Sequence, residues 1–156
     1  MTRHQFEVIG LPAPQGSKSA VTIGGEARII EGKTDGQRAK HKAWRIAVAQ
    51  AAKDLTTHED PTIRAEQFTG PTLLSVTFLM PRPKSRTKRH HGWHVVAPDL
   101  DKLLRSTLDG LTDGGLLADD KIVCTIAAAK AETTGWTGAM VTLEEILEPW
   151  EGRPLR

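Results

Sequence analysis

The sequence predicts an α+β domain in which two helices pack on one mixed β-sheet. Two segments have helical apolar periodicity, short strand-like runs lie before and after each of them, and the two kinds of segment alternate along the chain. The chain has 156 residues, 38% of them hydrophobic, which is enough for one core. We therefore expect residues 1–156 to form a single domain.

The N-terminal segments predict a strand and then a hairpin. Residues 5–11 mix apolar and β-branched side chains and precede a stretch rich in proline and glycine, which indicates a strand followed by a loop. Residues 20–30 predict a hairpin turning at Gly24 and Gly25, because this pair tolerates the positive φ angles of tight turns.

The first helix is predicted from Asp35 to about Leu55. Its apolar residues recur at helical spacing, so that one stripe faces a core, while basic residues occupy the opposite side. The stripe consists of Trp44, Ala47, Val48, Ala51 and Leu55.

The remaining elements follow from runs and breaks in the pattern. Residues 71–80 contain an apolar run suited to a buried strand. Residues 81–97 contain prolines and basic residues without any acid, which predicts a basic loop. Leucines from 100 to 111 describe a second helix that ends at an Asp-Gly-Gly sequence. Residues 121–131 and 138–146 predict two closing strands.

The cysteine content and the apolar runs predict a cytoplasmic location. Cys124 is the single cysteine, so no internal disulfide can form, and its apolar surroundings predict a small core residue. The first residues contain no apolar run of signal-peptide length, and no stretch approaches the ~20 apolar residues of a membrane span. We expect no association with a membrane.

The basic loop is a candidate DNA-binding surface. The formal net charge is only +2, so a polyanionic partner must be recognised by where the charges lie. A merely solvated loop is the alternative. Trp93 in the same loop could stack on an exposed base or anchor the loop by packing. The candidate DNA contacts of the loop are Arg82, Lys84, Arg86, Lys88 and Arg89.

Acidic residues at two places predict a metal site. Asp99 and Asp101 open the second helix, and Asp120 precedes the following strand. Magnesium prefers hard oxygen ligands and keeps several waters, so two or three carboxylates make a suitable site. The alternative for Asp99 is a helix N-cap. Asp119 is a further candidate ligand, but ordinary loop preferences favour a turn residue there.

One face of the second helix places a cation between carboxylates. Asp101, Arg105 and Asp109 are spaced four residues apart and therefore share a helical face. Arg105 could neutralise a substrate phosphate there. Asp109 could instead be only a solvated partner of Arg105.

These motifs together resemble the RusA family of Holliday-junction resolvases. The resemblance rests on the Pro-Asp-x-Asp sequence at 98–101 and the Asp-Asp pair at 119–120 before a strand. It also rests on Pro-Arg-Pro-Lys-Ser at 81–85 and Pro-Gln-Gly-Ser-Lys at 14–18. The matches cover most of the chain in the right order.

The resemblance implies an α+β homodimer that binds four-way junctions and makes paired nicks with Mg²⁺, or with Mn²⁺ in its place. It assigns catalytic and metal-binding roles to Asp99, Asp101 and Asp120, a catalytic role to Lys130, and a phosphate contact to Lys18. Arg105 departs from the lysine that the family commonly has there, and an arginine keeps the charge but does not readily exchange a proton. The alternatives are a general branched-DNA or flap nuclease and a non-catalytic DNA-binding protein.

Overall fold

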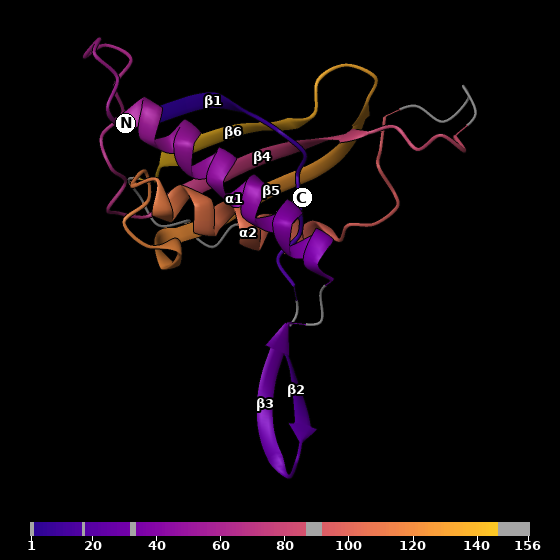
Figure 1. Ribbon diagram of the computed structural model, residues 1–156. Coiled ribbons are helices and arrows are strands. Elements are labelled where there is room, and N and C mark those ends of the chain that lie inside the picture. Colours follow the sequence, from indigo (N-terminus) through magenta and orange to yellow (C-terminus); the bar gives the residue numbers. More distant parts are fainter. Residues whose placement is uncertain (1, 17, 32–33, 87–91, 147–156) are drawn as a thin grey trace, which may run out of the picture.

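A computed structural model shows the arrangement of these elements (Figure 1) and describes residues 2–16, 18–31, 34–86 and 92–146. The elements follow the predicted order, with a short 3₁₀ helix, η1, before the fifth strand. Their bounds are β1 (Arg3–Ile9), β2 (Lys18–Ile23), β3 (Glu26–Glu31), α1 (Asp35–Thr56), β4 (Thr72–Pro81), α2 (Leu100–Asp113), η1 (Asp120–Ile122), β5 (Val123–Thr133) and β6 (Gly138–Glu145).

Four strands form one mixed sheet in the order β1-β6-β4-β5. β4 and β5 are parallel, and the other neighbouring pairs are antiparallel. The connection between parallel neighbours must cross over the sheet, and here it contains the basic loop and α2. The predicted class, two helices on one mixed sheet, is therefore confirmed.

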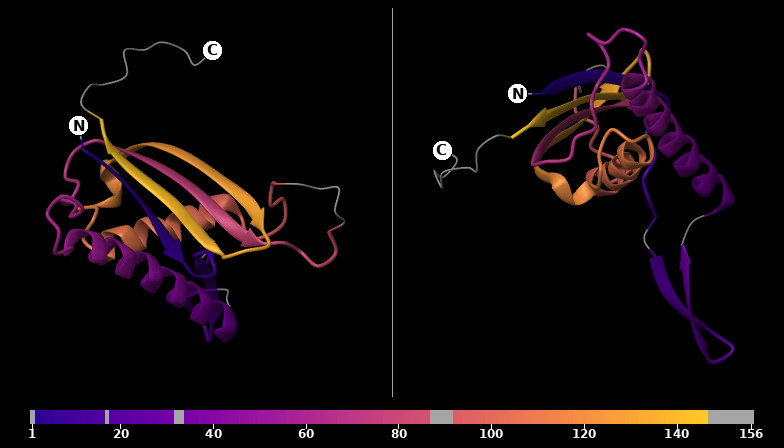
Figure 2. Two further views of the ribbon diagram at one scale, coloured as in Figure 1. Left: turned by 90° about the horizontal axis from the view of Figure 1, so that it is seen from above. Right: turned by 90° about the vertical axis from the view of Figure 1, so that its left-hand side faces the viewer.

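Both helices cover the same face of the sheet (Figure 2). Side chains of β4 alternate between buried and half-buried positions, as expected for a strand with one face on the core. The core between helices and sheet is built around large side chains that are less than 2% exposed, including Trp44, Leu74, Phe78, Leu103, Leu111 and Leu143.

A hydrogen bond inside this core joins the two helices. The indole Nε1 of Trp44 donates to Oγ1 of Thr107 at 3.2 Å, and that hydroxyl donates to the Leu103 carbonyl at 2.9 Å. The polar groups of both side chains are thus satisfied without water.

The helices approach closely because α2 carries a glycine at their contact. A Cβ built on Gly110 would lie 2.7 Å from the Val48 Cβ and 3.0 Å from the Arg45 carbonyl oxygen. A larger residue would push the helices apart. On the far side of the contact, Arg45 of α1 pairs with Asp109 at 3.2 Å and with Asp113.

The predicted hairpin forms, but it does not join the main sheet. β2 and β3 make a separate two-stranded sheet that projects away from the helices (Figure 1). Gly24 and Gly25 have φ angles of 62° and 86°, which is the reason a Gly-Gly pair suits this turn.

Two local predictions differ from the structure. Residues 120–122 form η1 where a strand beginning at 121 was expected, because the Asp119 side chain accepts from the Lys121 amide and starts a turn. Cys124 is exposed and not buried, because it lies on β5, an edge strand. Neither described helix has the length and apolar character needed to cross a bilayer.

Candidate nuclease site

The N-terminus of α2 presents Asp99 to solvent. Asp99 occupies the N-cap position, yet its side chain makes no capping hydrogen bond. Its carboxylate instead lies 2.8 Å from the Lys102 ammonium, and the side chain is 61% exposed. The hydrogen bond and charge of Lys102 lower the pKa of Asp99, with a smaller contribution from Lys130. The carboxylate is therefore ionised and accessible, and capping does not explain it.

Lys130 lies on the helix side of β5, and its contacts are backbone carbonyls. Its Nζ donates to the Val96 carbonyl at 2.9 Å and to the Pro98 carbonyl at 2.6 Å. These residues immediately precede Asp99. Lys130 therefore fixes the segment that leads into the site.

Asp101 and Arg105 lie in the first two turns of α2, and both are exposed. The sequence allowed Asp109 to pair with Arg105. In the structure Asp109 pairs instead with Arg45 of the neighbouring helix, at 3.2 Å. Asp109 therefore belongs to the helix–helix contact. Arg105 is left on the exposed side of α2, close enough to Lys102 for the two cations to repel.

η1 brings the second acidic pair beside α2, because the two elements are in contact. Asp119 caps η1: its side chain accepts from the Lys121 amide at 3.0 Å and pairs with the Lys121 ammonium at 2.9 Å. These interactions lower the pKa of Asp119. Its contacts are those of a turn residue, the interpretation that the sequence favoured. Asp120 is exposed.

The three predicted ligands have the chemistry for magnesium but are not assembled around one point. Carboxylate oxygens are what a hard cation prefers. Within the described ranges, however, no three His, Cys, Asp or Glu side chains gather closely enough to hold a metal. Asp99 and Asp101 remain on α2 and Asp120 on η1, so we derive no catalytic step through a bound ion.

The basic loop divides into a paired and an exposed part. Arg86 lies 3.2 Å from Glu132 in an ion pair, and the two side chains are 16% and 4% exposed. Arg86 is therefore held against β5 and does not present its charge to a ligand in this structure. Lys84 is exposed, and Arg82 is half-buried with its amide bonded to the Thr133 carbonyl. The predicted contacts Lys88 and Arg89 lie outside the described residues, as does the Lys18 side chain.

The end of the loop returns along β5. Trp93 forms a bridge with Ala131, and its side chain is 66% exposed, which rules out core packing. His94 is 5% exposed, and its Nε2 lies 3.2 Å from the Ala97 carbonyl. Its Nδ1 has no hydrogen-bond partner within the described part of the chain.

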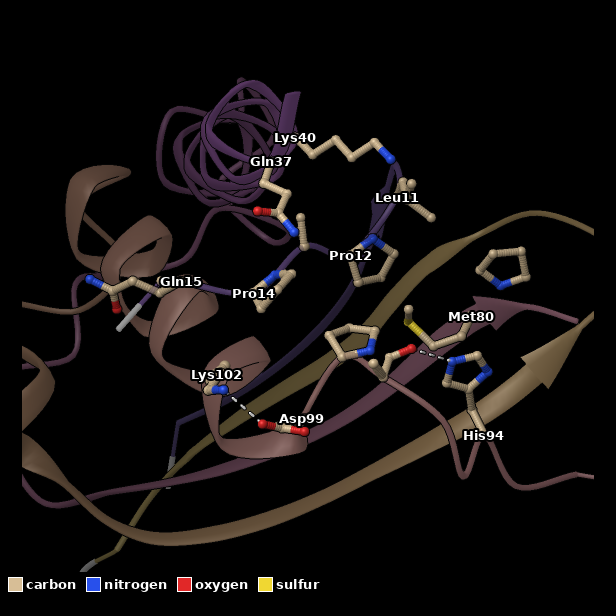
Figure 3. Close-up of a pocket in the computed structure, with 15 residues that line it drawn as sticks. Leu11, Pro12, Pro14, Gln15, Gln37, Lys40, Met80, His94, Asp99 and Lys102 are labelled. Carbon is tan, nitrogen blue, oxygen red and sulfur yellow. Dashed lines mark hydrogen bonds and ion pairs between the residues drawn. The ribbon is translucent and has the colours of Figure 1, made fainter. Parts of the chain in front are cut away.

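A cavity of about 620 Å³ adjoins Asp99 and Lys102 (Figure 3). Segments far apart in the sequence line it: the loop after β1, the first turns of α1, the end of β4 and the start of α2. The sequence motifs did not reveal this cavity, because no single segment forms it. They also missed Lys102, although its spacing three residues after Asp99 is the signal of a helical ion pair.

The protein is thus of the α+β class, with exposed carboxylates, nearby cations and a cavity together at the start of α2. The comparison with protein families agrees, since the family described as endodeoxyribonuclease RusA matches residues 14–144. The chain belongs to the RusA family. No curated protein matches it.

Membership of the family confirms the predicted class of enzyme. The chain is a nuclease of the Holliday-junction resolvase type, and its family acts on branched DNA in recombination. RusA resolvases are generally metal-dependent nucleases.

Proposed function

We propose that this protein is a magnesium-dependent endonuclease that resolves Holliday junctions by paired nicks, with Mn²⁺ as an alternative ion. The observation that carries the proposal is the ionised, solvent-exposed carboxylate of Asp99 at the start of α2, within a chain matched by the RusA family over residues 14–144. Asp99, Asp101 and Asp120 would hold the ion. A bound ion would lower the pKa of water and neutralise charge on the phosphate.

The residues around the carboxylates have separate roles in this proposal. Lys102 keeps Asp99 ionised, because its positive charge lies 2.8 Å from the carboxylate. Lys130 fixes the backbone before Asp99. Arg105, exposed on α2, supplies positive charge to the substrate phosphate, where an arginine can form two parallel hydrogen bonds.

In the part of the chain that the structure describes, no three carboxylates lie together, and this is compatible with the assignment. The donors lie on elements in contact, so side-chain rotations together with phosphate oxygens of the DNA would complete the coordination sphere. Phosphate oxygens of a bound junction would then supply the remaining ligands. The inactive alternative, a protein that only binds DNA, would not need the exposed acidic groups.

We also propose a homodimer. Two symmetric nicks need two active sites, and a two-fold dimer provides one in each subunit. The arrangement of the layers leaves room for such a contact: both helices lie on one face of the sheet, and no described helix covers the other face (Figure 2). Sedimentation of the purified protein at several concentrations would measure its mass.

The decisive experiment is incubation with labelled four-way, flap and linear duplex DNA, with Mg²⁺ and with EDTA. We expect symmetric nicks in the four-way junction only with the metal. Equal cleavage of flaps would favour the general branched-DNA nuclease. Binding without any nicked product in Mg²⁺ or Mn²⁺ would contradict the proposal.

A further inference from the structure

The cavity beside Asp99 has the chemistry of a nucleotide site. Its volume of about 620 Å³ lies within the ~300–1,000 Å³ range of ligand pockets. The side chains that form much of its wall are flat or aliphatic, and four of them are prolines: Leu11, Pro12, Pro14, Met80, Pro81 and Pro98. Such a wall suits the faces of a planar, weakly polar ring system.

Helices α1 and α2 also contribute charged and amide side chains to the lining of the cavity. Lys40 and Gln37 reach from α1 toward the loop after β1, and Lys102 lies at the other side beside Asp99 (Figure 3). Ammonium groups next to an apolar pocket are complementary to a group that carries both an aromatic ring and a phosphate. Nucleotides have this combination.

The side-chain amide of Gln37 offers a ligand its Nε2, which bonds no residue that the structure describes. Its Oε1 accepts from the Thr34 amide at 3.1 Å as part of the capping box of α1. This bond fixes the amide and leaves Nε2 as the donor. A ligand that presents an acceptor atom to Nε2 would be preferred over one that presents a donor, because two donors facing each other would both be left unpaired.

We propose that this cavity binds one nucleobase that is unstacked from the junction next to the scissile phosphate, and that Gln37 selects the base through a hydrogen-bond acceptor. The inference rests on the proposed function, because it places the scissile phosphate at Asp99. Stacked bases of a duplex cannot enter a concave cavity, whereas a base at a branch point is already weakly stacked and is extruded at lower cost. The cavity thereby gives the nuclease a sequence preference.

The first test measures base position by fluorescence. 2-Aminopurine is placed in turn at each position around the crossover of a four-way junction, and protein is added in EDTA. We expect one position next to the cleavage site to brighten, because unstacking relieves quenching and none of the described residues that line the cavity is Phe, Tyr or Trp. Lys40→Ala should reduce the brightening. Lys42→Ala removes the same charge from the same helix but not from the cavity wall, and should leave it unchanged.

The second test measures selectivity. Junctions with randomised bases at the crossover are cleaved in Mg²⁺ under single-turnover conditions, and the products are sequenced. Gln37→Glu keeps an oxygen for the Thr34 amide and replaces the donor with an acceptor, so the preference at the brightened position should fall by roughly tenfold. Gln37→Met should have a similar effect, and Lys42→Ala should have none.

The outcomes separate the inference from the proposed function. If no 2-aminopurine position brightens, or if Lys40→Ala and Lys42→Ala behave alike, no base enters the cavity, whatever the cleavage assay gives. An unchanged preference in Gln37→Glu overturns the selecting role of Gln37. Failure of the parent protein to nick any junction refutes the proposed function, whereas the fluorescence measurement still tests the cavity.

Discussion

The Nζ of Lys130 lies 2.6 Å from the carbonyl oxygen of Pro98, the residue that directly precedes Asp99. A lysine has three donors, and a second one bonds the Val96 carbonyl at 2.9 Å. β5 thereby holds the backbone from which the N-terminus of α2 starts. The position of the Asp99 carboxylate therefore depends on a side chain of β5, the strand that follows α2 in the chain.

Lys130→Ala should therefore slow cleavage without removing a phosphate contact. A misplacement of about 1 Å can lower a rate by ~10²-fold. The salt dependence of junction binding should stay unchanged, whereas each lost phosphate contact would lower the log–log slope by about 0.9 on duplex DNA. Lys53→Ala, an exposed lysine near the end of α1, is the control for general charge loss. A reduced slope for Lys130→Ala alone would mean that Lys130 contacts DNA.

Asp101→Asn should abolish cleavage and leave junction binding intact. Asparagine keeps the shape but loses the charge that a hard cation requires. Asp35→Asn provides a matched control, because Asp35 is the acidic residue in the first turn of the other helix. Single-turnover cleavage and a binding titration are measured on both variants. Cleavage by Asp101→Asn at the parent rate would remove Asp101 from the metal site.

Arg105→Ala should lower the single-turnover rate by ~10²-fold, as loss of a typical oxyanion donor does, with a smaller effect on binding. Arg105→Lys should retain much of the activity, since either side chain delivers a positive charge. The structure strengthens this test, because Asp109 forms its ion pair with Arg45 and not with Arg105. Equal rates for the alanine variant and the parent protein would make Arg105 a surface residue only.

The Arg45–Asp113 pair should stabilise the fold at neutral pH and not in acid. Arg45 donates from Nη2 to Oδ1 at 2.9 Å and from Nε to Oδ2, and the pKa of Asp113 is lowered mainly by this bonding. A lowered folded-state pKa gives stability that is present above the ordinary value near 3.9 and is lost as pH falls through the folded-state pKa.

The expected effect is modest, because the Asp113 side chain is 44% exposed and solvent screens the pair. Asp113→Asn should lower the free energy of unfolding by about 0.5–1 kcal/mol at pH ~7, and the difference should be smaller at pH ~3, below the ordinary pKa of a carboxyl group. Urea unfolding at both pH values measures it, with Glu59→Gln as an exposed control. A difference that persists in acid would show that something other than ionisation is lost.

Two glycine-to-alanine substitutions should have opposite signs. Gly110→Ala brings a methyl group within 2.7 Å of Val48 at the helix contact, and overpacking of this kind costs about 1–3 kcal/mol, more than the ~1 kcal/mol gained in helix propensity. Gly36→Ala, in the first turn of α1, meets no atom within 4 Å and should be neutral or stabilising. Denaturant unfolding compares them. Stabilisation by Gly110→Ala would contradict the close approach of the helices.

Element types were predictable because they depend on local periodicity. The apolar stripe through Trp44 and Val48, the run in β4 and the Gly24-Gly25 turn each carry their signal within a few residues. The acidic motif was visible for the same reason, since Asp99 and Asp101 are only two positions apart in the chain. Exposure at the edge of the sheet could not be predicted in this way, because it depends on the order of the strands. Cys124 was therefore wrongly expected in the core.

The sequence by itself determined which residues carry charge and which segments become helices and strands. Tertiary structure alone decided how those charges are used, because pairing partners come from segments distant in the chain. Arg86 of the basic loop pairs with Glu132 of β5, Asp109 of α2 pairs with Arg45 of α1, and Lys130 bonds backbone carbonyls before Asp99. Each choice follows from sheet order and helix packing, since ion pairs and hydrogen bonds act only over a few ångströms.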